Sequence, residues 1–112
     1  MPRFVILRHE KDETSHFDLM LESGGVLLTF SFAEFPVAGA SGERLVDHRL
    51  KYLDFEGGLA ERKGRVSRVD RGTFDLLSLA DEALHVHLRG DRLSGTFRLV
   101  KQSGETWAFD AE

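Results

Sequence analysis

The sequence predicts an all-β fold, an antiparallel barrel or sandwich of about seven or eight short strands. Apolar and polar residues alternate with period two through most of the chain, which is typical of strands with one buried face. Turn signals recur at intervals of about 8 to 12 residues, as they do in small sandwiches and barrels. The repeat typical of helices is hard to find. We therefore expect the 112 residues to form a single domain, 1–112.

The first predicted elements are an N-terminal strand and a hairpin. Residues 4–7 are apolar and are flanked by arginines, a run too short for a secretion signal, which needs about 7 to 15 apolar residues. Residues 16–22 alternate cleanly and predict a half-buried strand. Residues 23–25 are Ser-Gly-Gly and suit a tight turn, after which the apolar run 26–32 returns as the second strand.

The second half of the chain predicts a loop, another hairpin and a meander. Residues 36–42 are rich in small residues and indicate a surface loop, and residues 54–58 indicate a second loop packed over the sheet. Residues 65–77 read as two strands that turn at Arg71-Gly72. The stretches 83–89, 93–100 and 105–109 then alternate as a three-stranded meander.

Composition restricts the function classes. No cysteine is present, which excludes disulfides and thiolate chemistry and favours a reducing compartment, so we expect a cytoplasmic protein. No apolar run approaches the roughly 18 residues of a membrane span, so no membrane is expected. The net charge of −4 has the wrong sign for coating nucleic acid by bulk electrostatics, and phosphate binding would have to be local.

The candidate catalytic residues are histidines and one strand carboxylate. His16 and Asp18 share one face of a predicted strand, with Cα atoms about 6 to 7 Å apart, close enough to reach one ion or one phosphate. His9 ends the first predicted strand, and His48 and Tyr52 lie four residues apart in a third segment. The sequence alone leaves open whether these three segments meet in space.

His85 and His87 have the weakest case for a function. They share an exposed face of a predicted strand, and spacing along one strand does not by itself converge on a ligand. We expect both to be solvated side chains.

In order along the chain, several segments resemble the 3′-phosphoesterase domain of bacterial DNA ligase D. They are His9 and residues 16–22, 25–27, 47–57 and 70–73. The first motif of that family runs His, several residues, then His-Tyr-Asp-Phe-Arg-Leu-Glu, and here the strand reads His-Phe-Asp-Leu-Met-Leu-Glu. The second resembles Glu-Asp-His-Pro-Leu-Glu-Tyr-x-Asp-Phe-Glu-Gly, and here it reads Val-Asp-His-Arg-Leu-Lys-Tyr-Leu-Asp-Phe-Glu-Gly, the more specific match.

The resemblance implies a small closed β-barrel that holds Mn²⁺, or another divalent metal such as Zn or Co, and trims ribonucleotide and phosphate groups from DNA 3′ ends in end repair. Carried over by motif position, the metal ligands would be His9, Asp18 and His48. His16 would contact the scissile phosphate or protonate a leaving oxygen, and Tyr52 would donate a hydrogen bond to the phosphate. The implied partners are DNA 3′ ends or a nucleotide, with a ligase or polymerase on a separate chain.

The chain departs from the family pattern at three places. Met20 stands where the family has an arginine, which removes a bidentate cation from the expected phosphate site. The loop between His9 and His16 is one residue longer than in the family. Phe30 and Glu34 replace a tryptophan and a lysine, which puts an anion where the family has a cation.

Local basic residues offer a replacement for this charge. Residues 61–72 carry five cations against Glu61 and Asp70, a local charge of +3. The predicted phosphate-binding residues are Arg62, Arg65, Arg68 and, just before the second motif, Arg44. The alternative for the strip is an exposed strand face with salt-bridged arginines.

Two functions remain open at this level. The first is a divergent metal-dependent 3′-phosphoesterase. The second is a β-barrel binding module for DNA ends, a nucleotide or a repair partner, which has lost catalysis together with the arginine that Met20 replaces.

Overall fold

The computed structural model describes residues 1–60 and 62–112, so Glu61 of the predicted basic strip lies outside the described residues. The described chain is nearly all β, and its one helical element is the 3₁₀ turn η1, Leu50–Leu53. The strands are β1 Arg3–Lys11, β2 Thr14–Ser23, β3 Val26–Phe32, β4 Ala40–His48, β5 Gly57–Gly58, β6 Arg65–Ala80, β7 Ala83–Gly90, β8 Ser94–Ser103 and β9 Thr106–Ala111. Among the described residues, no helix is long and apolar enough to span a bilayer.

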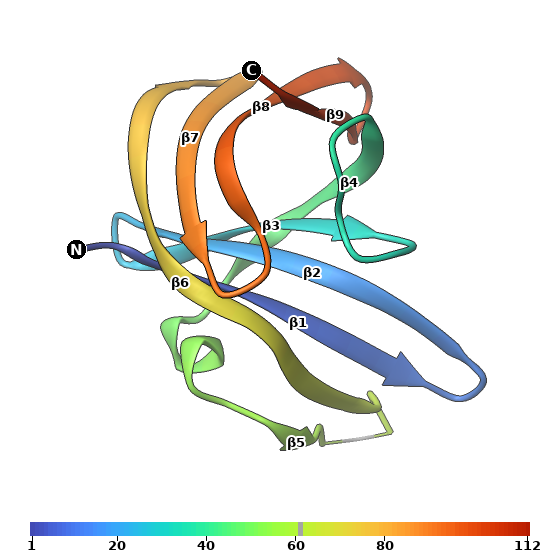
Figure 1. The fold of residues 1–112 in the computed structure, drawn as a ribbon. Helices are drawn as coiled ribbons and strands as arrows, with labels where there is room; N and C mark the ends of the chain where they lie inside the picture. Colours follow the sequence, from blue (N-terminus) through green and yellow to red (C-terminus); the bar gives the residue numbers. More distant parts are fainter. Residues whose placement is uncertain (61) are drawn as a thin grey trace.

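Eight of the nine strands close into a ring (Figure 1). Their order is β1-β2-β3-β4-β9-β8-β7-β6, and antiparallel pairing of β1 with β6 joins the two ends. The short β5 is added beside the N-terminal part of β6. The predicted all-β fold and its closure into a small antiparallel barrel are therefore confirmed.

The β1–β2 hairpin sets the register of the residues that matter most for function. Lys11 pairs with Thr14 across the two-residue turn, and Asp12 in that turn has a positive φ of 55°, a conformation that Asp tolerates better than most side chains. Counting back from the turn, His9 is the direct partner of His16. The predicted hairpin of β2 and β3 is also present, and Gly24 and Gly25 supply its positive φ values of 60° and 84°.

The predicted hairpin at Arg71-Gly72 is wrong. β6 runs without reversal from Arg65 to Ala80 and pairs first with β1 and then with β7. Gly72 is needed there for close packing, because a Cβ at this position would lie 1.9 Å from the carbonyl oxygen of Arg89. A turn glycine and a close-approach glycine look the same in one sequence.

The predicted loop over residues 36–42 is shorter than expected. Ala40, Ser41 and Gly42 already pair with β9 as the start of β4. Gly42 permits this pairing, since a Cβ there would lie 2.7 Å from the ring of Phe32. The predicted meander is confirmed as β7, β8 and β9.

The sheet buries apolar side chains on both faces where β1 and β2 cross the molecule. The larger cluster fills the ring and includes Phe4, Leu19 and Phe74. The smaller cluster lies on the opposite face and consists of Val5, Leu7, Met20, Leu27, Leu53 and Val66, with Tyr52, Phe55 and Leu59 packed against it. The segment from η1 to β5 covers this second face, as expected for a loop packed over the barrel.

Candidate metal centre

Three polar side chains meet on the β1–β2 hairpin. His9 Nδ1 lies 3.1 Å from His16 Nε2, and His16 Nε2 lies 3.3 Å from Asp18 Oδ1. One ligand atom from each residue lies within 4.8 Å of the other two. The hairpin register explains the convergence, because His9 opposes His16 directly and Asp18 follows two residues later on the same face.

The orientation of His9 is fixed from outside the hairpin. Its Nε2 lies 2.5 Å from the carbonyl oxygen of Lys63, which can only accept a hydrogen bond. The proton of neutral His9 is therefore on Nε2, and Nδ1 keeps a lone pair that faces His16 and Asp18. A backbone carbonyl that orients the far nitrogen of an imidazole is the usual support of a metal-ligating histidine.

Asp18 is a buried carboxylate without a hydrogen-bond partner for one oxygen. The residue is 4% exposed, and among the described residues nothing donates a hydrogen bond to Oδ1. Burial raises the pKa of the Asp18 carboxyl above its usual value, and the nearby His16 opposes this shift. An unsatisfied buried anion of this kind requires a cation or a proton.

The donor spacing fits a divalent metal ion. Ligand atoms about 2.1 Å from one ion at tetrahedral or octahedral angles lie roughly 3.0 to 3.4 Å from one another. The distances from His16 Nε2 to His9 Nδ1 and to Asp18 Oδ1, 3.1 and 3.3 Å, lie in this interval. Two imidazoles and one carboxylate on a single side leave the remaining coordination positions open, as in sites that bind a substrate beside the metal.

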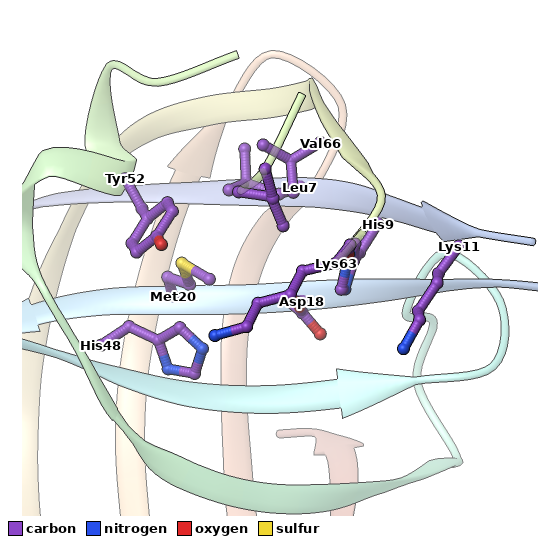
Figure 2. A pocket seen from close by; sticks show the side chains of 10 residues that line it. Leu7, His9, Lys11, Asp18, Met20, His48, Tyr52, Lys63 and Val66 are labelled. Atoms are coloured by element: carbon purple, nitrogen blue, oxygen red, sulfur yellow. Dashed lines mark hydrogen bonds between the residues drawn. The ribbon is translucent and has the colours of Figure 1, made fainter. Parts of the chain in front are cut away.

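A pocket of about 320 Å³ opens beside His9 and Asp18 (Figure 2). Its floor is apolar, formed by Leu7, Met20, Leu59 and Val66, and its polar lining is His9, Lys11, Asp18, His48, Tyr52 and Lys63. Figure 2 shows His48 and Tyr52 on the side of the pocket away from His9. The pocket therefore has His9 and Asp18 of the donor triad at one end and a second imidazole with a phenol at the other.

His48 is oriented separately from the triad. Its Nδ1 donates a hydrogen bond to the carbonyl oxygen of Val46 at 2.8 Å, which leaves Nε2 free for another partner. Its ring packs edge to face on Tyr52 with centroids 5.9 Å apart. The compact set of donor atoms thus comes from His9, His16 and Asp18. The set predicted from the sequence had His48 in place of His16, and metal binding by either set stays a prediction.

The predicted phosphate-binding arginines do not gather in the pocket. Arg44 lies on the ring-interior face, with its guanidinium 5.0 Å from the Phe30 ring centroid, and pairs with Asp47 at 3.8 Å. Period-two alternation separates the strip on β6, because Arg68 shares the face of the pocket and Arg65 points to the opposite face. Arg68 is paired with Glu56 at 3.7 Å, and Arg62 is exposed in the turn before β6. The alternative reading of salt-bridged strand arginines thus describes Arg68.

Lys11 and Lys63 line the pocket and were missed in the sequence. Lys63 lies within the basic strip but is a non-strand residue, so no strand period assigns it to a face. A sequence signal for a turn near Lys63 was Gly64, a residue type that readily adopts a positive φ. In the structure its φ is +95°, and a Cβ at this position would lie 2.0 Å from the carbonyl oxygen of Glu10. This close contact fastens the turn around Lys63 to the end of β1.

The sequence was compared with models of known protein families and with known proteins. The profile of the DNA Ligase D 3′-phosphoesterase domain matches residues 8–101. The chain is 31% identical over 115 residues to the multifunctional non-homologous end joining protein LigD of Mycobacterium bovis, covering 93% of this chain and 15% of that protein. The LigD protein of Pseudomonas aeruginosa is 31% identical over 111 residues, covering 88% of this chain and 13% of that protein. The chain thus spans only a small part of the length of these relatives.

Proposed function

Because the chain belongs to the DNA ligase D 3′-phosphoesterase domain family, we propose that it is a divalent-metal-dependent phosphoesterase that acts on DNA 3′ ends. The observation that carries the proposal is the donor triad of His9, His16 and Asp18, with Asp18 Oδ1 buried and unsatisfied among the described residues. The substrate would present a 3′ ribonucleotide or a 3′ phosphate. The proposed metal is Mn²⁺, with Zn²⁺ or Co²⁺ as substitutes.

His9, His16 and Asp18 would hold the metal. A divalent ion bound there supplies a Lewis acid for a phosphoryl oxygen. The carbonyl of Lys63 keeps His9 in the ligating tautomer, and the burial of Asp18 favours a charged partner over bulk water. The apolar floor of the pocket limits competing solvent next to the phosphate.

The second end of the pocket would act on the phosphate and the leaving group. His48 has Nε2 free and, when protonated, can donate a proton to a leaving oxygen. Figure 2 shows the Tyr52 hydroxyl on the pocket side of its ring, where it can donate a hydrogen bond to a phosphate oxygen. The proposal thus exchanges the roles that the sequence motif suggested for His16 and His48.

The test is turnover of a DNA primer that carries a 3′ phosphate or a 3′ ribonucleotide, with and without Mn²⁺. We expect turnover that requires metal, is lost in Asp18→Asn and falls strongly in His48→Ala, which retains the triad. His85→Ala is a matched control, because His85 lies on β7 outside the pocket lining. Turnover that persists in Asp18→Asn would contradict the proposal.

One observation favours a second function, a binding module for DNA ends, a nucleotide or a repair partner. Met20 occupies the floor of the pocket at 2% exposure, at the position where the family motif has an arginine. A module of this kind would bind metal and a DNA 3′ end but release no product at any metal concentration. The turnover assay, repeated with a DNA-binding measurement on the same samples, separates the two functions.

The relatives are named as multifunctional end joining proteins, and we propose that this domain also works in DNA end repair. A ligase or polymerase would act on the 3′ end after trimming. The cysteine-free composition suits the reducing cytoplasm as the place of this activity.

A further inference from the structure

The pocket is lined by a positively charged side chain, that of Lys63, to which the proposed function has given no role. Lys63 contributes two groups to it: a carbonyl oxygen 2.5 Å from His9 Nε2, and an ammonium group on a side chain that lines the cavity. Figure 2 shows this side chain extending across the pocket toward His48. Within the described residues Lys63 makes no ion pair, so its charge is available to a ligand.

The backbone around Lys63 is held firmly enough to present that charge. The Leu59 amide donates to the Gly64 carbonyl at 2.7 Å, and the Lys63 amide donates to Ala60 at 3.2 Å. Gly64 packs directly on the backbone of Glu10. The turn is therefore fixed to the end of β1, next to His9.

We propose that Lys63 is the phosphate-binding residue of this site and takes over the charge neutralisation that an arginine at position 20 would supply. The inference rests on the proposed function and names its anion-binding residue. A phosphate that spans from the triad to His48 would lie in the path of the Lys63 side chain, and an ammonium group donates charge-assisted hydrogen bonds to phosphate oxygens. Met20, buried in the floor, leaves this position without another cation from β2.

Lys11 gives a comparison within the same pocket. It also lines the cavity, but it ends β1, and Figure 2 shows its ammonium group on the far side of His9 from His48. A general attraction of anions by positive charge would depend on both lysines equally. Direct contact with a phosphate that lies between the triad and His48 would depend on Lys63 and much less on Lys11.

The experiment measures binding of inorganic phosphate to the Mn²⁺-loaded protein by calorimetry, with KM and kcat on the 3′-phosphate primer in parallel. For Lys63→Met we expect roughly tenfold weaker phosphate binding and a higher KM, while the rise in Tm caused by Mn²⁺ stays unchanged because the carbonyl to His9 remains. Lys63→Arg should retain most of the affinity. Lys11→Met should weaken binding less, and Lys101→Met, an exposed lysine on β8, should behave as wild type.

Unchanged phosphate affinity in Lys63→Met, or an equal loss in Lys63→Met and Lys11→Met, would overturn the assignment. This result is distinct from failure of the proposed function. If the wild type and Lys63→Met turn over the primer equally well, the protein is a phosphoesterase but Lys63 is not its phosphate-binding residue. If the protein shows no turnover but binds phosphate through Lys63, the role of Lys63 holds and the proposed enzymatic activity is wrong.

Discussion

Asp18 determines how the site depends on pH. Burial raises the pKa of its carboxyl above the usual 3.8, so the folded protein binds this proton more tightly than the unfolded chain. Stability from this group is present below pH 3.8 and is lost as pH rises through the raised folded pKa. Without metal, the ionised carboxylate is therefore a destabilising group at neutral pH.

Replacing Asp18 with Asn should stabilise the metal-free protein at neutral pH, because the buried charge disappears. The gain in Tm over wild type should shrink as pH falls toward 3.8, where both side chains are neutral. The measurement is thermal unfolding in a chelator as a function of pH. A metal-free variant that is less stable than wild type at pH 7 would contradict this account of Asp18.

The two candidate ligand sets differ in a stability measurement. With Mn²⁺ at about 100 times its Kd, binding stabilises the fold by about 2.7 kcal/mol, which corresponds to roughly 10 to 20 °C in Tm for a domain of this size. We expect this rise in wild type and in His48→Ala, and its loss in His16→Ala. Loss in His48→Ala with retention in His16→Ala would restore the set that the sequence motif suggested.

Met20 is the residue at which the family charge is missing. Met20→Arg should raise phosphoesterase turnover, and the increase should be larger in a Lys63→Met background, where no other cation competes for the phosphate. Met20→Leu is the control for packing, because Leu and Met are close in volume. Turnover that rises equally in both backgrounds would show that position 20 and Lys63 do not serve the same oxygen.

Among individual residues, the sequence predicted the chemistry better than the geometry. His9, His16 and Asp18 were all candidates, and their pairing follows from a two-residue turn at Asp12-Glu13 that alternation alone did not reveal. The place of His48 depends on the β4–β3 register, which shifts between Leu27 and Thr29. An irregularity of this kind leaves no periodic signal, so no reading of one strand could find it.

At the scale of elements, strands with clean alternation were predictable and long-range packing was not. The β2–β3 hairpin and the β7–β9 meander carry both alternation and turn glycines. β6 lacks clean alternation through its middle, and its Gly72 resembles a turn glycine, because the bulge and the close contact with β7 depend on the partner strands. β4 is largely polar and has no fully buried residue, so it lacks the apolar alternation that indicates a strand.

Gly72 tests this account of β6. Gly72→Ala should destabilise the fold by about 1 to 3 kcal/mol, because the new Cβ meets the backbone carbonyl of Arg89 and cannot rotate away. Gly58→Ala is the matched control, since a Cβ at Gly58 meets nothing within 4 Å. Denaturant unfolding of both variants is the measurement. Equal stability of the two would show that β6 and β7 can separate at this point without cost.

For the whole molecule, closure of the ring separates a structural face from a functional one. The interior cluster stabilises the barrel, while the outer face of β1, β2 and the first part of β6 carries the triad and the pocket. Pairing with β1 places Arg68 and Arg71 on the outer face, opposite Leu7 and Val5, and Arg65 on the other face, opposite Glu10. Arg68 is already paired to Glu56, and the pocket itself is lined by Lys11 and Lys63.

This distribution of positive charge predicts that the affinity for DNA depends only weakly on salt concentration. With a net charge of −4 and two lysines, Lys11 and Lys63, lining the pocket, the protein should neutralise about two phosphates there, so a plot of log affinity against log salt concentration should have a slope of about −2. Fluorescence anisotropy of a labelled duplex with a 3′-phosphate end measures it. Lys63→Met should reduce the magnitude of the slope by about one, since each phosphate contact contributes about 0.9. Arg65→Gln, on the opposite face of β6, should leave it unchanged. A slope of about −5 or steeper, or one that depends on Arg65, would mean that DNA runs along the arginines of β6 rather than ending in the pocket.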